Sequence, residues 1–358
     1  MTTGNREKIR VLLVDDSPLV LVLIQRMLAT ASDIEVLDTA SNGQEALEKI
    51  ERLRPDVICT DLNMPVMNGL ELTQAVMERF PTPILVISIA VQKEDEGNVF
   101  ELLRAGAVDV FPKPRGGLHS DEAAFTGELL NKIRVVSGVV VFHKNRPSQG
   151  RTALPPAAAG VASQTNVEIS KKIKITAIGA STGGPQAYAA LLSKLPASYP
   201  TPILCVQHIS LGFLSGLVEW LDHQCALRVQ VAEPGTIAKP GRVYFPEEDT
   251  HLGIDPDGTL RSLRTDAFHG FRPSATVLFE SVAKSFGARS LGILMTGMGD
   301  DGAAGLKVLR DTGATTIAQD QSTSTVFGMP REAIALGAAE HVLALPDIAP
   351  TLKKLFGL

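Results

Sequence analysis

The sequence of 358 residues contains only three cysteines, Cys59, Cys205 and Cys225. They lack the spacing of metal ligands, and two of them lie in apolar strand-like segments. This usage indicates reduced thiols in a core rather than a disulfide framework or a cysteine-based metal site.

The sequence also has neither a large excess of one charge sign nor a long apolar run. The net charge of −5 disfavours a nucleic-acid-binding protein with a large basic surface. No segment approaches the roughly 18 uninterrupted apolar residues of a membrane span. Residues 1–10 are polar and contain no apolar signal region. We therefore expect a cytoplasmic protein without membrane insertion and without bound nucleic acid.

The length favours two domains, and both halves of the sequence alternate short apolar strands with amphipathic helical patterns. Such alternation predicts α/β domains with doubly wound, mostly parallel sheets, and an antiparallel edge hairpin is expected around His251–Leu263 of the second domain. We expect an N-terminal (βα)5 domain at 6–138, a flexible linker at 139–172 and a second α/β domain at 173–358. The linker is predicted because 143–172 is rich in Pro, Ala, Gly, Ser and Gln and has no apolar periodicity.

Polar residues follow four of the strands predicted in the first domain. Asp15 and Asp16 follow the first strand, Asp61 the third, Ser88 the fourth and Lys113 the fifth. Because ligands of parallel sheets bind beyond the carboxyl ends of the strands, these side chains are expected to converge there. Three carboxylates would repel one another without a hard cation, and Mg²⁺ prefers oxygen ligands. Ser88 and Lys113 could hold the oxygens of a phosphoryl group delivered to one carboxylate. The alternative is a set of ordinary polar loop residues.

These residues and their neighbours resemble a response-regulator receiver domain of the flavodoxin-like class. The motifs are Asp15-Asp16, residues 60–65 (TDLNMP) with Asn68-Gly69, Ser88, and Lys113-Pro114. The resemblance implies Mg²⁺ bound by Asp15, Asp16 and Asp61, and phosphorylation of Asp61 by a sensor histidine kinase. It also implies switching through Ser88 and Lys113.

One position departs from the receiver pattern. Receivers usually carry an aromatic residue three positions before the lysine, and this sequence has Val110 there. Phe111 is adjacent but is predicted on the opposite face of its strand. The route by which phosphorylation would reach the second domain is therefore open.

In the second domain, Ser181 lies at a small-residue corner between a predicted strand and a helix that begins near Pro185. Backbone N–H groups and the positive helix end would face negative charge developing there, as a nucleophile requires. A glycine-rich phosphate site of the dinucleotide-binding type would use the same geometry. That alternative lacks a G-x-G-x-x-G turn and an acidic residue at the end of the next strand.

Two later strand ends offer partners to a serine nucleophile. His208 follows the next strand, where a general base is needed. Asp300 and Asp301 follow another strand and precede a helix, so one of them could orient the histidine. The alternative for either aspartate is capping of that helix, and spacing alone does not choose between them.

Together these motifs resemble the catalytic domain of the chemotaxis protein-glutamate methylesterases, the CheB family. The matching segments are 179–184 (GASTGG), Gln207-His208, 296–302 (TGMGDDG), Gln319-Asp320 and 328–330 (GMP). The resemblance implies a serine nucleophile at Ser181, a base at His208 and an orienting acid at Asp301. It further implies that Thr182 helps to hold the histidine and that the Met298 N–H contributes to oxyanion binding.

Two segments near this site depart from the family. Ile209-Ser210 replaces a usual Met-Pro pair, and residues 244–251 (YFPEEDTH) are unusually acidic. Both changes flank the predicted triad, so they concern substrate preference more than chemistry.

The two resemblances imply an esterase that is activated by phosphorylation and needs no cofactor for hydrolysis. Its substrates would be glutamyl γ-methyl esters, and also glutamines, of methyl-accepting chemoreceptors, and its phosphodonor a kinase of the CheA type. The main alternative is a non-enzymatic signalling adaptor that binds receptor or kinase. A nucleotide-binding effector and a DNA-binding output are weaker alternatives, the latter because no basic recognition helix is evident.

Overall fold

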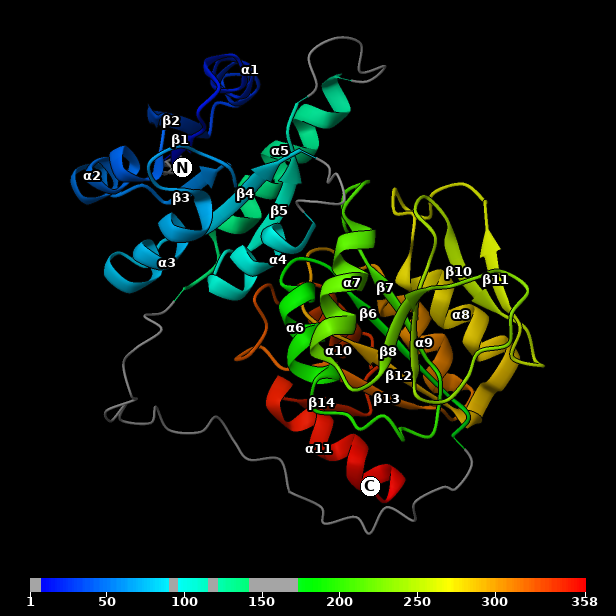
Figure 1. The fold of residues 1–358 in the computed structure, drawn as a ribbon. Coiled ribbons are helices and arrows are strands. Elements are labelled where there is room, and N and C mark those ends of the chain that lie inside the picture. The colour runs from blue at the N-terminus through cyan, green and yellow to red at the C-terminus, as the bar shows by residue number, and fades with distance from the viewer. Residues whose placement is uncertain (1–7, 90–95, 115–121, 142–172) are drawn as a thin grey trace, which may run out of the picture.

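The computed structural model describes residues 8–89, 96–114, 122–141 and 173–358. Most of the predicted linker, residues 142–172, lies outside the described residues. Figure 1 shows two α/β units, one built from the N-terminal and one from the C-terminal part of the chain. The predicted fold class is confirmed.

The N-terminal unit is a five-stranded parallel sheet with the strand order β2-β1-β3-β4-β5. Strands β3 and β4 are buried along their whole length, as expected for central strands covered by helices on both faces. The elements are β1 Ile9–Val14, α1 Pro18–Leu28, β2 Ile34–Ala40, α2 Gly43–Leu53, β3 Val57–Thr60, α3 Gly69–Arg79, β4 Ile84–Ser88, α4 Glu96–Ala105, β5 Asp109–Pro112 and α5 Glu122–Ser137.

Local sequence explains where these helices begin. Asn68 and Glu71 form a capping box at the start of α3, in which each side chain accepts a hydrogen bond from the other residue's backbone N–H. Ser17 and Asn42 cap α1 and α2 in the same unit. Asp15 and Asp16 thus lie in the short loop between β1 and the capped start of α1, and Asp61 lies in the loop between β3 and the capped start of α3.

The C-terminal unit has a seven-stranded parallel sheet with the order β14-β13-β12-β6-β7-β9-β8. Its elements are β6 Ile175–Ala180, α6 Gly184–Leu192, β7 Ile203–Gln207, α7 Leu214–Gln224, β8 Arg228–Val231, β9 Arg242–Phe245, β10 His251–Ile254, β11 Leu260–Leu263, α8 Ala275–Phe286, the 3-10 turn η1 Gly287–Arg289, β12 Ser290–Leu294, α9 Ala303–Asp311, β13 Thr315–Gln319, α10 Met329–Ala335, β14 His341–Leu343 and α11 Leu345–Phe356.

Strand β6 is central, and the chain runs outward from it in both directions, first through β7 and later through β12. Helices α6, α7 and α11 pack on one face of the sheet, and α8, α9 and α10 on the other. A ligand crevice forms where strand order reverses in such a sheet. The carboxyl ends of β6, β7 and β12, which carry the predicted catalytic residues, lie at this reversal.

The hairpin expected at 251–263 is present, as β10 and β11. It forms a separate two-stranded antiparallel sheet rather than an edge of the main sheet. Helix α8 packs against both β10 and the main sheet, since Leu252 and Ile254 share an apolar cluster with Leu278 and Phe279.

The two units share a continuous apolar cluster in which α4 meets α6 and α7. Phe100 of α4 stacks on Trp220 of α7, with ring centroids 5.6 Å apart. The Gln186 side-chain amide of α6 donates a 2.8 Å hydrogen bond to the carbonyl of Ala107, just before β5. Two separately wound sheets are thereby held together by buried contacts.

Among the helices described in the structure, none combines the length and apolar character needed to cross a bilayer.

Phe100→Ala is expected to open a cavity beside Trp220, with a loss of about 3 kcal/mol in the free energy of unfolding. Trp220 is the single tryptophan of the chain, so its fluorescence emission should shift to longer wavelength as water reaches it. Leu19→Ala, at a side chain that is 65% exposed, is the control and should change stability by less than about 0.5 kcal/mol. An unchanged emission in Phe100→Ala would contradict the described packing.

Candidate active site and phosphorylation site

Ser181 lies at the end of β6, where the chain turns into α6. Gly183, which caps α6, has a φ of +77°, a conformation that favours glycine. A Cβ on Gly184 would lie 1.9 Å from Oε1 of Gln207, and a Cβ on Gly297 would lie 2.7 Å from Cβ of Ser181. The small residues of both corners are therefore needed to pack the strand ends around the serine.

The Ser181 backbone is fixed from two sides. Its N–H donates to the Thr296 carbonyl at 2.9 Å, and its carbonyl accepts from the Gln207 side-chain amide at 2.7 Å. The Thr296 hydroxyl in turn donates to the Thr182 carbonyl. The side chain of Ser181 is held at a pocket of about 490 Å³ that His208, Thr182 and Met298 also line.

His208 follows β7, and its ring has a polar contact at one edge and an aromatic contact on one face. Its Nε2 lies 2.8 Å from Oδ2 of Asp301. The ring stacks on Phe271, with centroids 4.3 Å apart and planes 11° from parallel. Its Nδ1 is buried and has no hydrogen-bond partner among the described residues. A buried basic nitrogen left without a partner beside Ser181 has the chemistry of a proton acceptor.

Asp301 is 4% exposed and accepts hydrogen bonds on both carboxylate oxygens. The Ser274 hydroxyl and the Thr276 N–H donate to Oδ1, and the Ala275 N–H donates to Oδ2 beside His208. Burial by itself would raise the pKa of Asp301, but the contacts with His208, Ser274 and Ala275 outweigh it and hold that pKa well below its usual range. The carboxylate is therefore ionised at neutral pH.

The structure separates the two aspartates that spacing left equivalent. Asp300 is exposed, whereas Asp301 is buried against His208. Neither side chain caps α9, whose N-cap is Gly302 without a side-chain hydrogen bond. Asp301 instead binds backbone N–H groups at the start of α8. Asp301 thus accepts hydrogen bonds from the start of α8 and does not cap α9, the helix that directly follows it in the sequence.

The two supporting residues are placed differently. The Met298 N–H donates to no residue within the described ranges, and Met298 lines the pocket, so this N–H is available for an oxyanion. No hydrogen bond joins Thr182 to His208 in the part of the chain that is described. The predicted contribution of Thr182 through the histidine stays a prediction.

Residues near the site that the motifs did not indicate are Phe271, Ser274 and His251. Phe271 and Ser274 lie in the irregular loop 266–274 before α8, where no periodic pattern marks them. The acidic residues of 244–251 have partners in the fold: Glu248 accepts from the Gly212 N–H before α7, and Asp249 pairs with Arg272 at 2.7 Å. Two acidic side chains of this segment are therefore held by contacts within the fold, Glu248 by a hydrogen bond and Asp249 by an ion pair.

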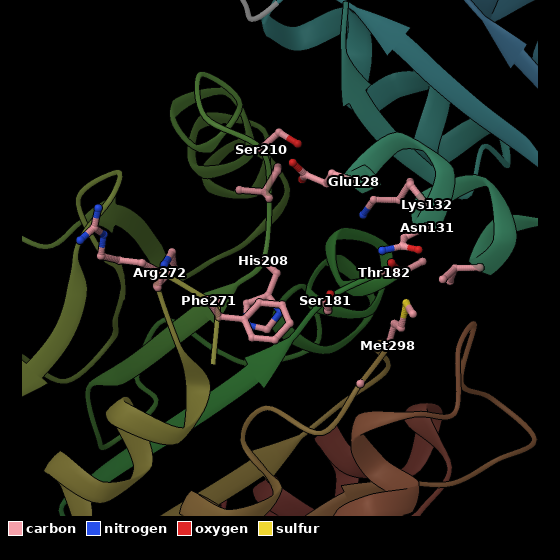
Figure 2. Close-up of a pocket in the computed structure, with 15 residues that line it drawn as sticks. Glu128, Asn131, Lys132, Ser181, Thr182, His208, Ser210, Phe271, Arg272 and Met298 are labelled. Atoms are coloured by element: carbon pink, nitrogen blue, oxygen red, sulfur yellow. The ribbon is translucent and has the colours of Figure 1, made fainter. Parts of the chain in front are cut away.

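Helix α5 of the N-terminal unit covers the mouth of the Ser181 pocket. Figure 2 shows Glu128, Asn131 and Lys132 of α5 across the pocket from Ser181, His208 and Met298. Lys132 is not a free cation, since its ammonium pairs with Asp109 at 2.8 Å. Ile209 and Ser210, the residues that depart from the family pattern, line the same pocket.

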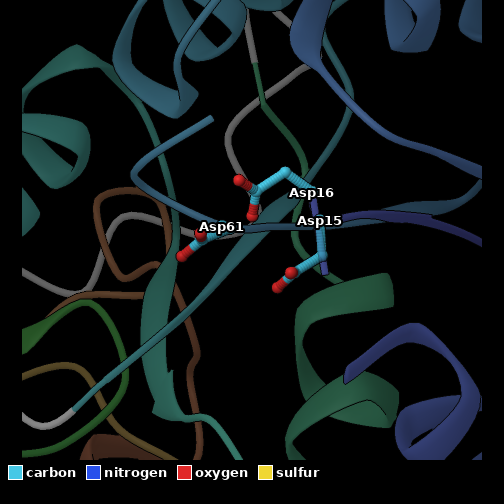
Figure 3. A group of neighbouring side chains, drawn as sticks. All are labelled: Asp15, Asp16 and Asp61. Atoms are coloured by element: carbon cyan, nitrogen blue, oxygen red, sulfur yellow. The ribbon is translucent and has the colours of Figure 1, made fainter. Parts of the chain in front are cut away.

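At the carboxyl edge of the N-terminal sheet, Asp15, Asp16 and Asp61 come together (Figure 3). Each offers a carboxylate oxygen, and these oxygens lie within 4.8 Å of one another. Lys113 lies 2.7 Å from Asp15 and 2.9 Å from Asp61. One lysine leaves an excess of negative charge among three carboxylates, so the cluster fits a divalent cation with oxygen ligands.

Burial raises the pKa of Asp61 from 3.8 to about 6, against the opposite effect of Lys113 and with a smaller contribution from the charge of Asp15. Burial would lower the pKa of Lys113, but its hydrogen bonds with Asp15 and Asp61 raise it. Ser88 is buried at the end of the neighbouring strand, and its carbonyl accepts from the Lys113 N–H.

Val110 stands three residues before Lys113, where the receiver pattern usually has an aromatic residue. Val110 packs in the cluster shared with the C-terminal unit, and Phe111 packs on the other face of the sheet against Phe125 of α5. The prediction that these two residues face opposite sides is confirmed.

Comparison with known proteins agrees with both parts of the chain. Residues 176–352 match the family model CheB methylesterase, and residues 11–119 match the response regulator receiver domain. A protein-glutamate methylesterase/protein-glutamine glutaminase of Hahella chejuensis is 43% identical over 352 residues, covering 96% of this chain and 98% of its own. One from Geobacter metallireducens is 40% identical over 348 residues, covering 97% and 99%.

The chain belongs to the CheB methylesterase family. The crystal structure of the CheB methylesterase catalytic domain of Thermotoga maritima is also similar, at 36% identity and a TM-score of 0.50. The matched region covers 51% of this chain and 98% of the Thermotoga maritima chain. The N-terminal unit is thus a receiver domain and the C-terminal unit a CheB catalytic domain, as the motifs predicted.

Asp61→Asn should stabilise the metal-free protein at pH 7. The raised pKa means that ionising Asp61 opposes folding, so wild-type stability falls as pH rises from about 4 through about 6. The variant lacks this loss and should gain on the order of 2 kcal/mol at pH 7 but little at pH 4. Chemical denaturation with a chelator present measures the difference.

Asp33→Asn is the matched control with the opposite sign. Its hydrogen bond with Arg134 lowers the pKa of Asp33 to about 2, so ionised Asp33 favours the fold above pH 4. The control should lower stability at pH 7. If Asp61→Asn lowered it as well, the conclusion that burial disfavours ionised Asp61 in the folded protein would be wrong.

Proposed function

We propose that this protein is a phosphorylation-regulated esterase that hydrolyses glutamyl γ-methyl esters on the cytoplasmic regions of chemoreceptors and releases methanol. The observation that carries the proposal is the series of Ser181, His208 and Asp301 at three adjacent strand ends, in which the buried Nδ1 of His208 has no partner among the described residues. The names of the curated relatives and the family model support the same reaction.

In the acylation step, Ser181 Oγ attacks the γ-carbonyl carbon of the ester while Nδ1 of His208 takes the serine proton. Ionised Asp301 stabilises the imidazolium through Nε2. The Met298 N–H donates to the oxyanion. His208 then gives its proton to the departing methoxide, so that methanol leaves and a glutamyl ester of Ser181 remains.

Deacylation repeats these roles with water. His208 removes a proton from water, hydroxide attacks the acyl carbon, and the proton returns to Ser181 Oγ as glutamate leaves. A glutamine side chain can enter the same sequence and release ammonia in the first step, which is the second activity in the relatives' names. These steps use water, the Met298 N–H and the side chains of Ser181, His208 and Asp301.

Regulation would operate through the receiver domain. Asp15, Asp16 and Asp61 would hold Mg²⁺, which supplies charge neutralisation during phosphoryl transfer to Asp61 from a histidine kinase of the CheA type. Lys113 and Ser88 would bind the phosphoryl oxygens.

Lys113 also lines a second cavity, of about 500 Å³, whose walls include Glu128 of α5 and Arg272 of the catalytic domain. Glu128 and Arg272 line the Ser181 pocket as well. Movement of Lys113 can therefore alter the covering of Ser181 by α5 without an aromatic residue at position 110. A free-energy change of about 1.4 kcal/mol would shift the fraction of uncovered sites up to tenfold.

Ser181→Ala should abolish methanol release from methylated receptor membranes, with activity falling by at least about 1,000-fold because the nucleophile is lost. Leu211→Ala is a control for surface changes near the site, since that side chain is 61% exposed. Wild-type activity in Ser181→Ala would exclude the acyl-enzyme mechanism. No methanol from the wild type, with receptor binding intact, would instead favour the signalling adaptor.

Treatment of the wild type with acetyl phosphate and Mg²⁺ should raise methanol release severalfold and change Trp220 fluorescence, because the tryptophan lies at the contact of the two domains. Asp61→Ala should show neither change but should keep basal turnover. Equal stimulation of both proteins would rule out regulation through Asp61.

A further inference from the structure

A second buried histidine, His251, lies behind the catalytic residues at the start of β10. It is fully buried, and both ring nitrogens have backbone partners. Its Nδ1 accepts from the Ser274 N–H at 3.1 Å, and its Nε2 lies 3.2 Å from the Asp266 carbonyl oxygen. A backbone N–H only donates and a carbonyl only accepts, so the ring is neutral with its proton on Nε2.

These two hydrogen bonds join the two ends of one loop. Residues 266–274 leave the hairpin and enter α8, and His251 binds the first and last of them. Between these ends, Phe268 and Phe271 exchange backbone hydrogen bonds. The loop presents Phe271, whose ring stacks on His208. His251 therefore fixes the base of the loop that forms one wall of the active site.

His251 is also connected to Asp301, the partner of His208 at Nε2, through Ser274. Ser274 is the N-cap of α8, and its hydroxyl donates to Oδ1 of Asp301 at 2.7 Å. The next two residues, Ala275 and Thr276, donate their N–H groups to the same carboxylate. Since His251 accepts the Ser274 N–H, it sets the orientation of the first residue of this carboxylate-binding turn.

We infer that His251 is a positioning residue for the hydrolase reaction, holding Phe271 against the face of His208 and Ser274 against Asp301. The inference rests on the proposed function of His208 and Asp301. Without the Nδ1 acceptor, the Ser274 N–H would be buried without a partner and the turn would shift. Because a misplacement of about 1 Å in catalytic geometry can cost about 100-fold in rate, turnover should depend on this acceptor.

Two substitutions of similar polarity separate the two ring nitrogens. His251→Asn can place an amide oxygen near the position of Nδ1 and keep an acceptor for Ser274. His251→Gln reaches the position of Nε2 and keeps a donor for Asp266. We expect kcat for methanol release to fall by about 10- to 100-fold in the Gln variant and by less than about threefold in the Asn variant, with KM changing less than kcat.

Tyr244→Phe is the matched control for loss of a buried hydrogen bond. The Tyr244 hydroxyl accepts from the Lys239 N–H and lines none of the pockets described above. This variant should be destabilised without a change in kcat. A purely structural role for His251 would give kcat losses that follow thermal stability across all three variants, and that result would overturn the inference.

Nitrogen-15 NMR of the wild-type imidazoles tests the same inference without any substitution. His251 should be neutral with its proton on Nε2, and His208 should show a low-field Nε2 proton shared with Asp301. That proton should persist in His251→Asn and weaken in His251→Gln. A charged His251, or a proton on its Nδ1, would overturn the inference. This result does not depend on the methanol assay, whose failure for the wild type would contradict the proposed function instead.

Discussion

The site depends on one buried carboxylate, that of Asp301. Taking an ionised carboxylate out of water is costly unless donors replace the lost hydration. Here the start of α8 supplies Ser274, Ala275 and Thr276, and His208 supplies the remaining contact. The carboxylate thus links α8, the β12 corner and the β7 corner, and the same contacts that offset its burial orient the imidazole next to Ser181.

The two chemical centres occupy equivalent places in two differently wound sheets. In each unit, polar side chains gather beyond the carboxyl ends of parallel strands, because that edge exposes strand ends and helix starts together. The packing of α4 on α6 and α7 then fixes how these edges face each other, with α5 between them. In the proposed regulation, a phosphoryl group at Asp61 would act through Lys113 on the contact that covers Ser181.

Much of this architecture was predictable. The strands of both sheets follow from apolar runs bounded by Gly, Pro and Asp, and the placement of Asp15, Asp61 and Lys113 follows from parallel pairing. Strand β14 was not predicted, since three residues, of which Val342 is 48% exposed, carry too little pattern. The hairpin was placed correctly but not its separation from the main sheet, because sheet membership depends on contacts with α8 that local sequence does not encode.

Local periodicity and small residues were enough to predict the two α/β units, the acidic edge with its lysine, and the corner that carries Ser181. Tertiary structure decided between Asp300 and Asp301, directed the carboxylate of Asp301 to α8, placed Phe271 on the ring of His208, and placed His251 at the base of the loop that carries Phe271. Each of these joins residues far apart in the chain, as His208 and Asp301 are. Only the packing of strands and helices brings such side chains within hydrogen-bond distance.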